Sequence, residues 1–122
     1  AVVDALTVPE GTDELRARLA LEDLHAPSLL DYEVVSALRG LTLAGRLSEA
    51  RATDALADFN DVPITRWRFE DALRQRAFQI RHTVSGYDAA YVVLAEALDC
   101  PLVTRDRRLA RSHGHDASIE VQ

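Results

Sequence analysis

Hydrophobic and polar residues follow two different periods along this chain, and each period predicts one kind of element. Short apolar runs typical of strands occur at 1–3, 24–27, 64–67, 101–103 and 118–121. Apolar residues at helical spacing predict helices from 12 toward 24, and over about 30–45, 48–58, 69–80, 88–98 and 107–112. Strands and helices therefore alternate through the whole sequence.

This alternation predicts the fold class. Strands separated by helices favour an α/β protein, a three-layer α/β/α sandwich with a central, mostly parallel sheet covered by helices on both faces. The 122 residues show no internal repeat, low-complexity segment or linker, and a chain of this length buries a substantial core. We therefore expect that residues 1–122 fold as one domain.

Composition narrows the class of protein. The apolar fraction of 48% and the charged fraction of 28% are those of an ordinary globular protein. A single cysteine, Cys100, excludes an internal disulfide and a cysteine-based zinc site, and its apolar neighbours predict that it is buried. The longest apolar run, Ala89 to Ala95, is far shorter than the ~20 residues of a membrane-spanning helix. No stretch resembles a signal peptide, so we expect a cytoplasmic protein.

The charge distribution matters more than the net charge of −6, which argues mildly against nonspecific coating of nucleic acid. All 14 basic residues are arginine, which is typical of a GC-rich genome. Four of them form a local basic patch beside Asp106, at positions 105, 107, 108 and 111. Arg105, Arg107 and Arg108 have two open interpretations at this point, contact with a phosphate backbone or a solvated surface.

Four carboxylates occupy positions where ligands gather in such a fold. Asp4 and Asp106 follow apolar strands, whereas Glu33 and Asp88 lie in the first turns of helices. In an α/β sheet these positions converge on the edge at the carboxyl ends of the strands. Two carboxylates about 4 Å apart repel by several kcal/mol at an intermediate dielectric, so a cation is needed. Oxygen ligands without histidine or thiolate favour Mg²⁺ or Mn²⁺.

Each acid also has an ordinary explanation. Asp88 is a candidate helix cap, Asp4 a candidate turn residue, and Glu33 a candidate solvated residue. Glu96, eight residues after Asp88, either extends the acidic pocket or is a partly exposed helix residue. His113 and His115 lack a third ligand at matched spacing and are interpreted as surface histidines.

Four sequence blocks, in this order, resemble those of the PIN-domain nucleases, most closely the VapC toxins of prokaryotic toxin–antitoxin pairs. They are "VVD" at 2–4, "EVVSALR" at 33–39, "YDAAYVVLAEAL" at 87–98 and "LVTRDRRL" at 102–109. The resemblance implies that Asp4, Glu33, Asp88 and Asp106 form a metal-binding acidic quartet. It also implies that Thr104, two residues before the last acid, orients Asp106 or a water in the site.

The same resemblance implies a function. The chain would be a Mg²⁺- or Mn²⁺-dependent endoribonuclease that hydrolyses RNA phosphodiester bonds with a metal-activated water, leaving 5′-phosphate and 3′-hydroxyl ends. A homodimer is implied, together with a VapB-type antitoxin that covers the acidic groove, often with an arginine, in a heterotetramer or larger complex. The remaining alternative is a catalytically silent PIN-like module that binds RNA or a protein partner.

The sequence departs from the family pattern after Asp4. The family continues there with a small residue and an apolar helix, whereas "DALTVPEGTDE" reaches a Pro-Glu-Gly break almost at once. Roughly two helical turns of the family pattern are absent, either because this protein carries a deletion or because residues are missing between Ala5 and Leu6, and we expect the second. Other folds with acidic pockets fit less well. A receiver domain requires a lysine, which this chain lacks, and the D-x-D and D-x-S-x-S patterns of two further classes are absent after the first strand.

Overall fold

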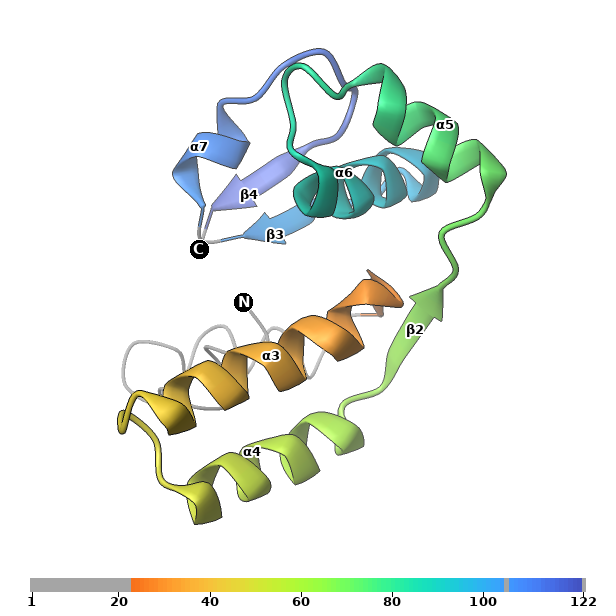
Figure 1. Ribbon diagram of the computed structural model, residues 1–122. Coiled ribbons are helices and arrows are strands. Elements are labelled where there is room, and N and C mark those ends of the chain that lie inside the picture. The colour runs from red at the N-terminus through yellow and green to blue at the C-terminus, as the bar shows by residue number, and fades with distance from the viewer. Residues whose placement is uncertain (1–22, 105, 122) are drawn as a thin grey trace. The chain divides into compact units, whose positions relative to one another are not determined.

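The computed structural model describes residues 23–104 and 106–121, shown in colour in Figure 1. The described residues form two compact units, the first made of 23–25 and 30–65 and the second of 26–29, 66–104 and 106–121. Several predictions of the sequence fall outside the described residues. They are the strand at 1–3, the helix from 12, Asp4, the junction of Ala5 and Leu6, and Arg105.

The first unit contains two helices, α3 (Leu29–Leu43) and α4 (Glu49–Asp61). Both present apolar residues at i and i+4, and these meet in one buried cluster with Leu47, formed by Val34, Leu38, Ala55 and Phe59. Gly45 follows α3 with a φ of +73°, a conformation that glycine adopts without steric cost. Ser48 is the predicted N-cap of α4, and its Oγ accepts from the Arg51 N–H at 3.2 Å.

Two predicted strands, β1 (Leu24–Pro27) and β2 (Ile64–Trp67), are confirmed and form a two-stranded sheet. The pairing continues one residue past β1, where the Ser28 N–H donates to the Trp67 carbonyl at 3.0 Å. The helix predicted over 69–80 is α5 (Asp71–Gln79). Phe69 precedes it and Ile80 caps its end, so the two outermost apolar positions of the pattern lie just outside the helix.

The second unit packs three helices and a parallel strand pair around one core. α6 (Gly86–Leu98) lies against α5, and β3 (Leu102–Thr104) pairs in parallel with β4 (Ile119–Val121) in a register that joins Leu102 to Ile119. The short helix α7 (Arg107–Ala110) connects the two strands on one side. The predicted α/β class with parallel strands is thereby confirmed, although β3 begins one residue later than expected and α7 ends two residues earlier.

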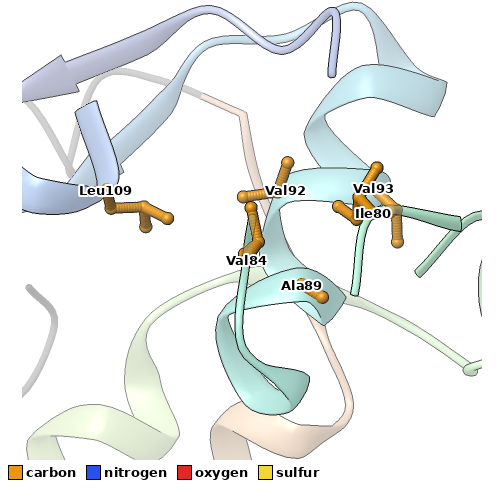
Figure 2. Close-up of a cluster of buried hydrophobic side chains, with 6 residues drawn as sticks. All are labelled: Ile80, Val84, Ala89, Val92, Val93 and Leu109. Atoms are coloured by element: carbon orange, nitrogen blue, oxygen red, sulfur yellow. The ribbon is translucent and has the colours of Figure 1, made fainter. Parts of the chain in front are cut away.

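The apolar run of α6 forms the centre of this core (Figure 2). The cluster contains six buried residues from α6, α7 and the segment before α6, namely Ile80, Val84, Ala89, Val92, Val93 and Leu109. Val92 is fully buried, and full burial of such a side chain contributes about 1.5–3 kcal/mol. The apolar run from Ala89 to Ala95 is uninterrupted because α6 buries residues on more than one of its faces.

The end of α6 is a tight left-handed cap. Asp99 has a φ of +51°, its N–H donates to the Glu96 carbonyl at 3.3 Å, and the Cys100 N–H reaches back to the Ala95 carbonyl at 3.1 Å. Cys100 follows this cap and is half-buried rather than buried as predicted. Among the described helices, none has the length and apolar character needed to cross a membrane.

Candidate active site

Asp106 lies two residues beyond β3 and is the N-cap of α7. Its Oδ1 accepts from the backbone N–H groups of Arg108 at 2.9 Å and Leu109 at 3.4 Å. Its Oδ2 accepts no hydrogen bond from any described residue, and the side chain is 37% exposed. One oxygen therefore holds the helix, while the other is available to a ligand.

Thr104 fixes the backbone of the same acid. It is the last residue of β3, and its Oγ1 accepts from the Asp106 N–H at 3.1 Å. This side-chain-to-backbone hydrogen bond bridges the end of β3 and the start of α7, so it restrains the backbone that carries the Asp106 carboxylate.

Asp88 lies in the first turn of α6 and is exposed. The N-cap is Ser85 rather than Asp88, so the interpretation of Asp88 as the cap itself is wrong. Ser85 Oγ donates to Asp88 Oδ2 at 3.3 Å, and the helix N-terminus provides a favourable field for the negative charge. Asp88 is therefore a carboxylate positioned by its neighbour, with its charge toward solvent.

Asp88 and Asp106 are linked through the core of the second unit. Ala89, which follows Asp88, and Leu109, which closes the first turn after Asp106, belong to the same buried cluster (Figure 2). The two helices whose starts carry these acids, α6 and α7, therefore contribute to one hydrophobic core.

The other two predicted acids do not belong to the described part of the second unit. Glu33 is half-buried in the second turn of α3 and belongs to the first unit, while Asp4 lies outside the described residues. Within 23–104 and 106–121, no three His, Cys, Asp or Glu side chains gather as a metal-binding group. The acidic quartet thus stays a prediction.

The basic patch begins helix α7. Arg107 and Arg108 are its first two residues and both are exposed, with the Arg108 Nε 3.7 Å from Asp106 Oδ1. A cation at a helix N-terminus is disfavoured by the helix dipole, so the adjacent carboxylate offsets part of this cost. Two exposed arginines therefore lie next to Asp106.

Comparison with known proteins decides the family. The PIN domain profile matches residues 1–113. The chain belongs to the PIN-domain family. It is 42% identical over 121 residues to "Ribonuclease VapC12" of Mycobacterium tuberculosis, covering 99% of this chain and 92% of the relative. Ribonuclease VapC1 of the same organism is 40% identical over 122 residues (99% and 92%), and Ribonuclease VapC9 is 43% identical over 108 residues (88% and 84%).

Glu96 of this PIN domain is a structural acid. Its Oε1 and Oε2 accept from Arg76 Nε at 2.7 Å and Nη2 at 3.1 Å, and Oε2 also accepts from the Asp116 N–H at 2.8 Å. The hydrogen bond from Arg76 lowers the pKa of Glu96, and the same contact raises the pKa of Arg76. Glu96 therefore joins α5, α6 and the loop before β4, and it does not extend the acidic site.

The two histidines near the C-terminal end of the chain differ in their contacts. His115 Nδ1 accepts from the Ala117 N–H at 3.2 Å, so the neutral ring carries its proton on Nε2, which donates to Ser112 Oγ at 2.8 Å. His113 is exposed. Our sequence analysis missed Ser85, although a serine three residues before an acid at a helix start is a recognisable signal.

Proposed function

We propose that this PIN domain, as a single domain over 1–122, is a metal-dependent endoribonuclease and the toxin of a toxin–antitoxin pair. One observation carries the proposal. Asp106 presents an oxygen that no described residue occupies, and it belongs to the same unit as Asp88, which Ser85 restrains. Relatives named as VapC ribonucleases over nearly the full length support the assignment.

The residues fit a hard divalent cation. The proposed ligands Asp4, Glu33, Asp88 and Asp106 offer only carboxylate oxygens, the donors that Mg²⁺ and Mn²⁺ prefer. When bound, such an ion lowers the pKa of a coordinated water and offsets charge on the phosphate oxygens.

The chain's own residues would prepare the site for an RNA phosphodiester. Thr104 holds the Asp106 backbone and Asp106 Oδ1 caps the helix, so Oδ2 is the oxygen that would hold the ion. Ser85 restrains Asp88 in the same way. Arg105, Arg107 and Arg108 would contact phosphates of the bound strand, because guanidinium groups pair well with phosphate oxygens.

The proposed biological setting follows from the relatives' names and from the chemistry of the acids. A VapB-type antitoxin would inhibit by placing an arginine among the carboxylates, which it can pair with in the absence of metal. We further propose a homodimer, a heterotetramer or larger complex with the antitoxin, and a cytoplasmic location in a prokaryote.

The test is cleavage of a total-RNA pool by the purified chain, with Mg²⁺, with Mn²⁺ and with chelator. Wild type should cut only with metal, and Asp88→Asn should not cut. Asp54→Asn, which removes an exposed acid of α4 outside the proposed quartet, is the matched control and should cut like wild type. Equal cleavage by wild type and Asp88→Asn would expose a contaminating nuclease and remove the enzymatic assignment. RNA binding without cleavage under every condition would favour the silent module.

A further inference from the structure

The C-terminal end of α5 carries an exposed aromatic–arginine pair that the acidic site does not use. Phe78 is 67% exposed, and the Arg81 guanidinium lies over its ring, 4.2 Å from the ring centroid. The opposite face of α5 is accounted for, since Leu73, Ala77 and Ile80 pack into the core. Nothing in the packing of the second unit therefore explains why a large apolar ring faces outward here.

The pair lies in a stretch of the sequence without acids. Residues 72–87 contain no acid in a protein with 20, and they contain three arginines, at positions 74, 76 and 81. Arg74 pairs with Asp71, and Arg76 pairs with Glu96. Among the described residues, Arg81 has no carboxylate partner; one Nη1 N–H donates to the Phe78 carbonyl at 2.9 Å, and the remaining donors are left for a ligand.

The position of the pair connects it to Asp88. The loop 80–85 is a tight turn in which the N–H groups of Thr83 and Val84 both donate to the Ile80 carbonyl, at 3.0 and 3.1 Å. This loop joins the end of α5 to the start of α6 (Figure 1). Tyr87 follows this loop directly before Asp88 in the first turn of α6, and it is 73% exposed.

We propose that Phe78, Arg81 and Tyr87 bind the single-stranded RNA that flanks the bond to be cut. Bases stack on the Phe78 and Tyr87 rings, and Arg81 contacts a phosphate between them. The donors that Arg81 leaves unused favour an anionic ligand, and the two exposed aromatic rings favour unpaired bases over a duplex. This inference rests on the proposed ribonuclease function and assigns to it a second contact, outside the acids and the α7 arginines.

Affinity should be measured in an Asp88→Asn background, with chelator, so that the RNA stays intact. The probes are a short fluorescent oligouridine and an abasic strand of the same length. Phe78→Leu and Tyr87→Leu keep apolar volume but lose the ring, so each should raise the Kd for oligouridine about 5- to 100-fold and leave the abasic strand unchanged within about twofold. Arg81→Gln should weaken both probes and reduce the slope of log Kd against log salt by about 0.7.

The other end of α5 supplies a matched control, since it carries a second aromatic–arginine pair, Phe69 and Arg74, in which Arg74 donates to the Phe69 carbonyl. Phe69→Leu and Arg74→Gln should leave both affinities unchanged, and thermal unfolding checks that each variant is folded.

Unchanged oligouridine affinity in Phe78→Leu, Tyr87→Leu and Arg81→Gln would overturn the inference while leaving the nuclease intact, provided that the Asp88→Asn parent binds RNA and wild type cuts it. A parent that binds neither probe, with a wild type that cuts no RNA, would remove both proposals. A change in molecular mass or antitoxin affinity in Phe78→Leu, with RNA affinity preserved, would make this surface a protein interface and would also overturn the inference.

Discussion

Replacing Glu96 with glutamine should destabilise the protein without touching the acidic site. The Glu96 side chain is only 17% exposed and accepts three hydrogen bonds, two from the Arg76 guanidinium and one from the Asp116 N–H. Glutamine retains one acceptor oxygen but turns an NH₂ group toward a donor, so at least one hydrogen bond to a charged partner is lost. Such a bond contributes about 1.5–3 kcal/mol. We expect a loss of about this size in the free energy of unfolding at pH 7.

Urea unfolding at pH 7 measures this loss directly, and a thermal scan should show a decrease of about 5–15 °C in Tm for a chain of this length. Glu70→Gln is the control, because Glu70 is exposed and its side chain makes no capping hydrogen bond. In a double-mutant cycle, Arg76→Met with Glu96→Leu should be less destabilised than Glu96→Leu alone, since removing both partners leaves no unpaired charge.

The effect should depend on pH with a definite sign. The folded-state pKa of Glu96 is lowered, so in acid the unfolded chain takes up the proton before the folded chain does. The stability difference between wild type and Glu96→Gln is therefore full above the ordinary glutamate pKa of about 4.3 and shrinks as the pH falls below it. A difference below about 0.5 kcal/mol at pH 7, or one that grows on acidification, would refute the structural role of this acid.

Three further predictions concern the start of α7, the end of β3 and the end of α6. Asp106→Asn should abolish Mn²⁺ binding by calorimetry while keeping the α7 cap, whereas Asp106→Ala should also lose about 1 kcal/mol of stability; equal stability of the two variants would contradict the capping role. Thr104→Val should lower cleavage about tenfold with Thr104→Ser restoring it, and a fully active Thr104→Val would remove its positioning role. Asp99→Gly should stabilise the chain by up to about 1 kcal/mol in urea, because glycine adopts the positive φ of this cap without strain; a loss of stability would contradict this.

Much of the fold was predictable because its determinants are local. The i, i+4 spacing of Val34 with Leu38 and the Ser48 cap define α3 and α4 from neighbouring residues alone. The β3 pattern likewise put Asp106 beyond a strand end, where the structure places it. Patterns of this kind work because helix periodicity and capping act within about one turn of the chain.

Only the tertiary structure decided the partners of the polar groups. Arg76 and Glu96 are twenty residues apart, and only the packing of α5 against α6 brings them together, so no local pattern distinguishes Glu96 from a ligand acid. The same packing leaves Phe78 and Arg81 exposed at the end of α5. Periodicity specifies which residues of a helix are apolar, but the partner of a charged side chain depends on which elements meet, because the strength of an ion pair is set by distance and burial in the folded chain.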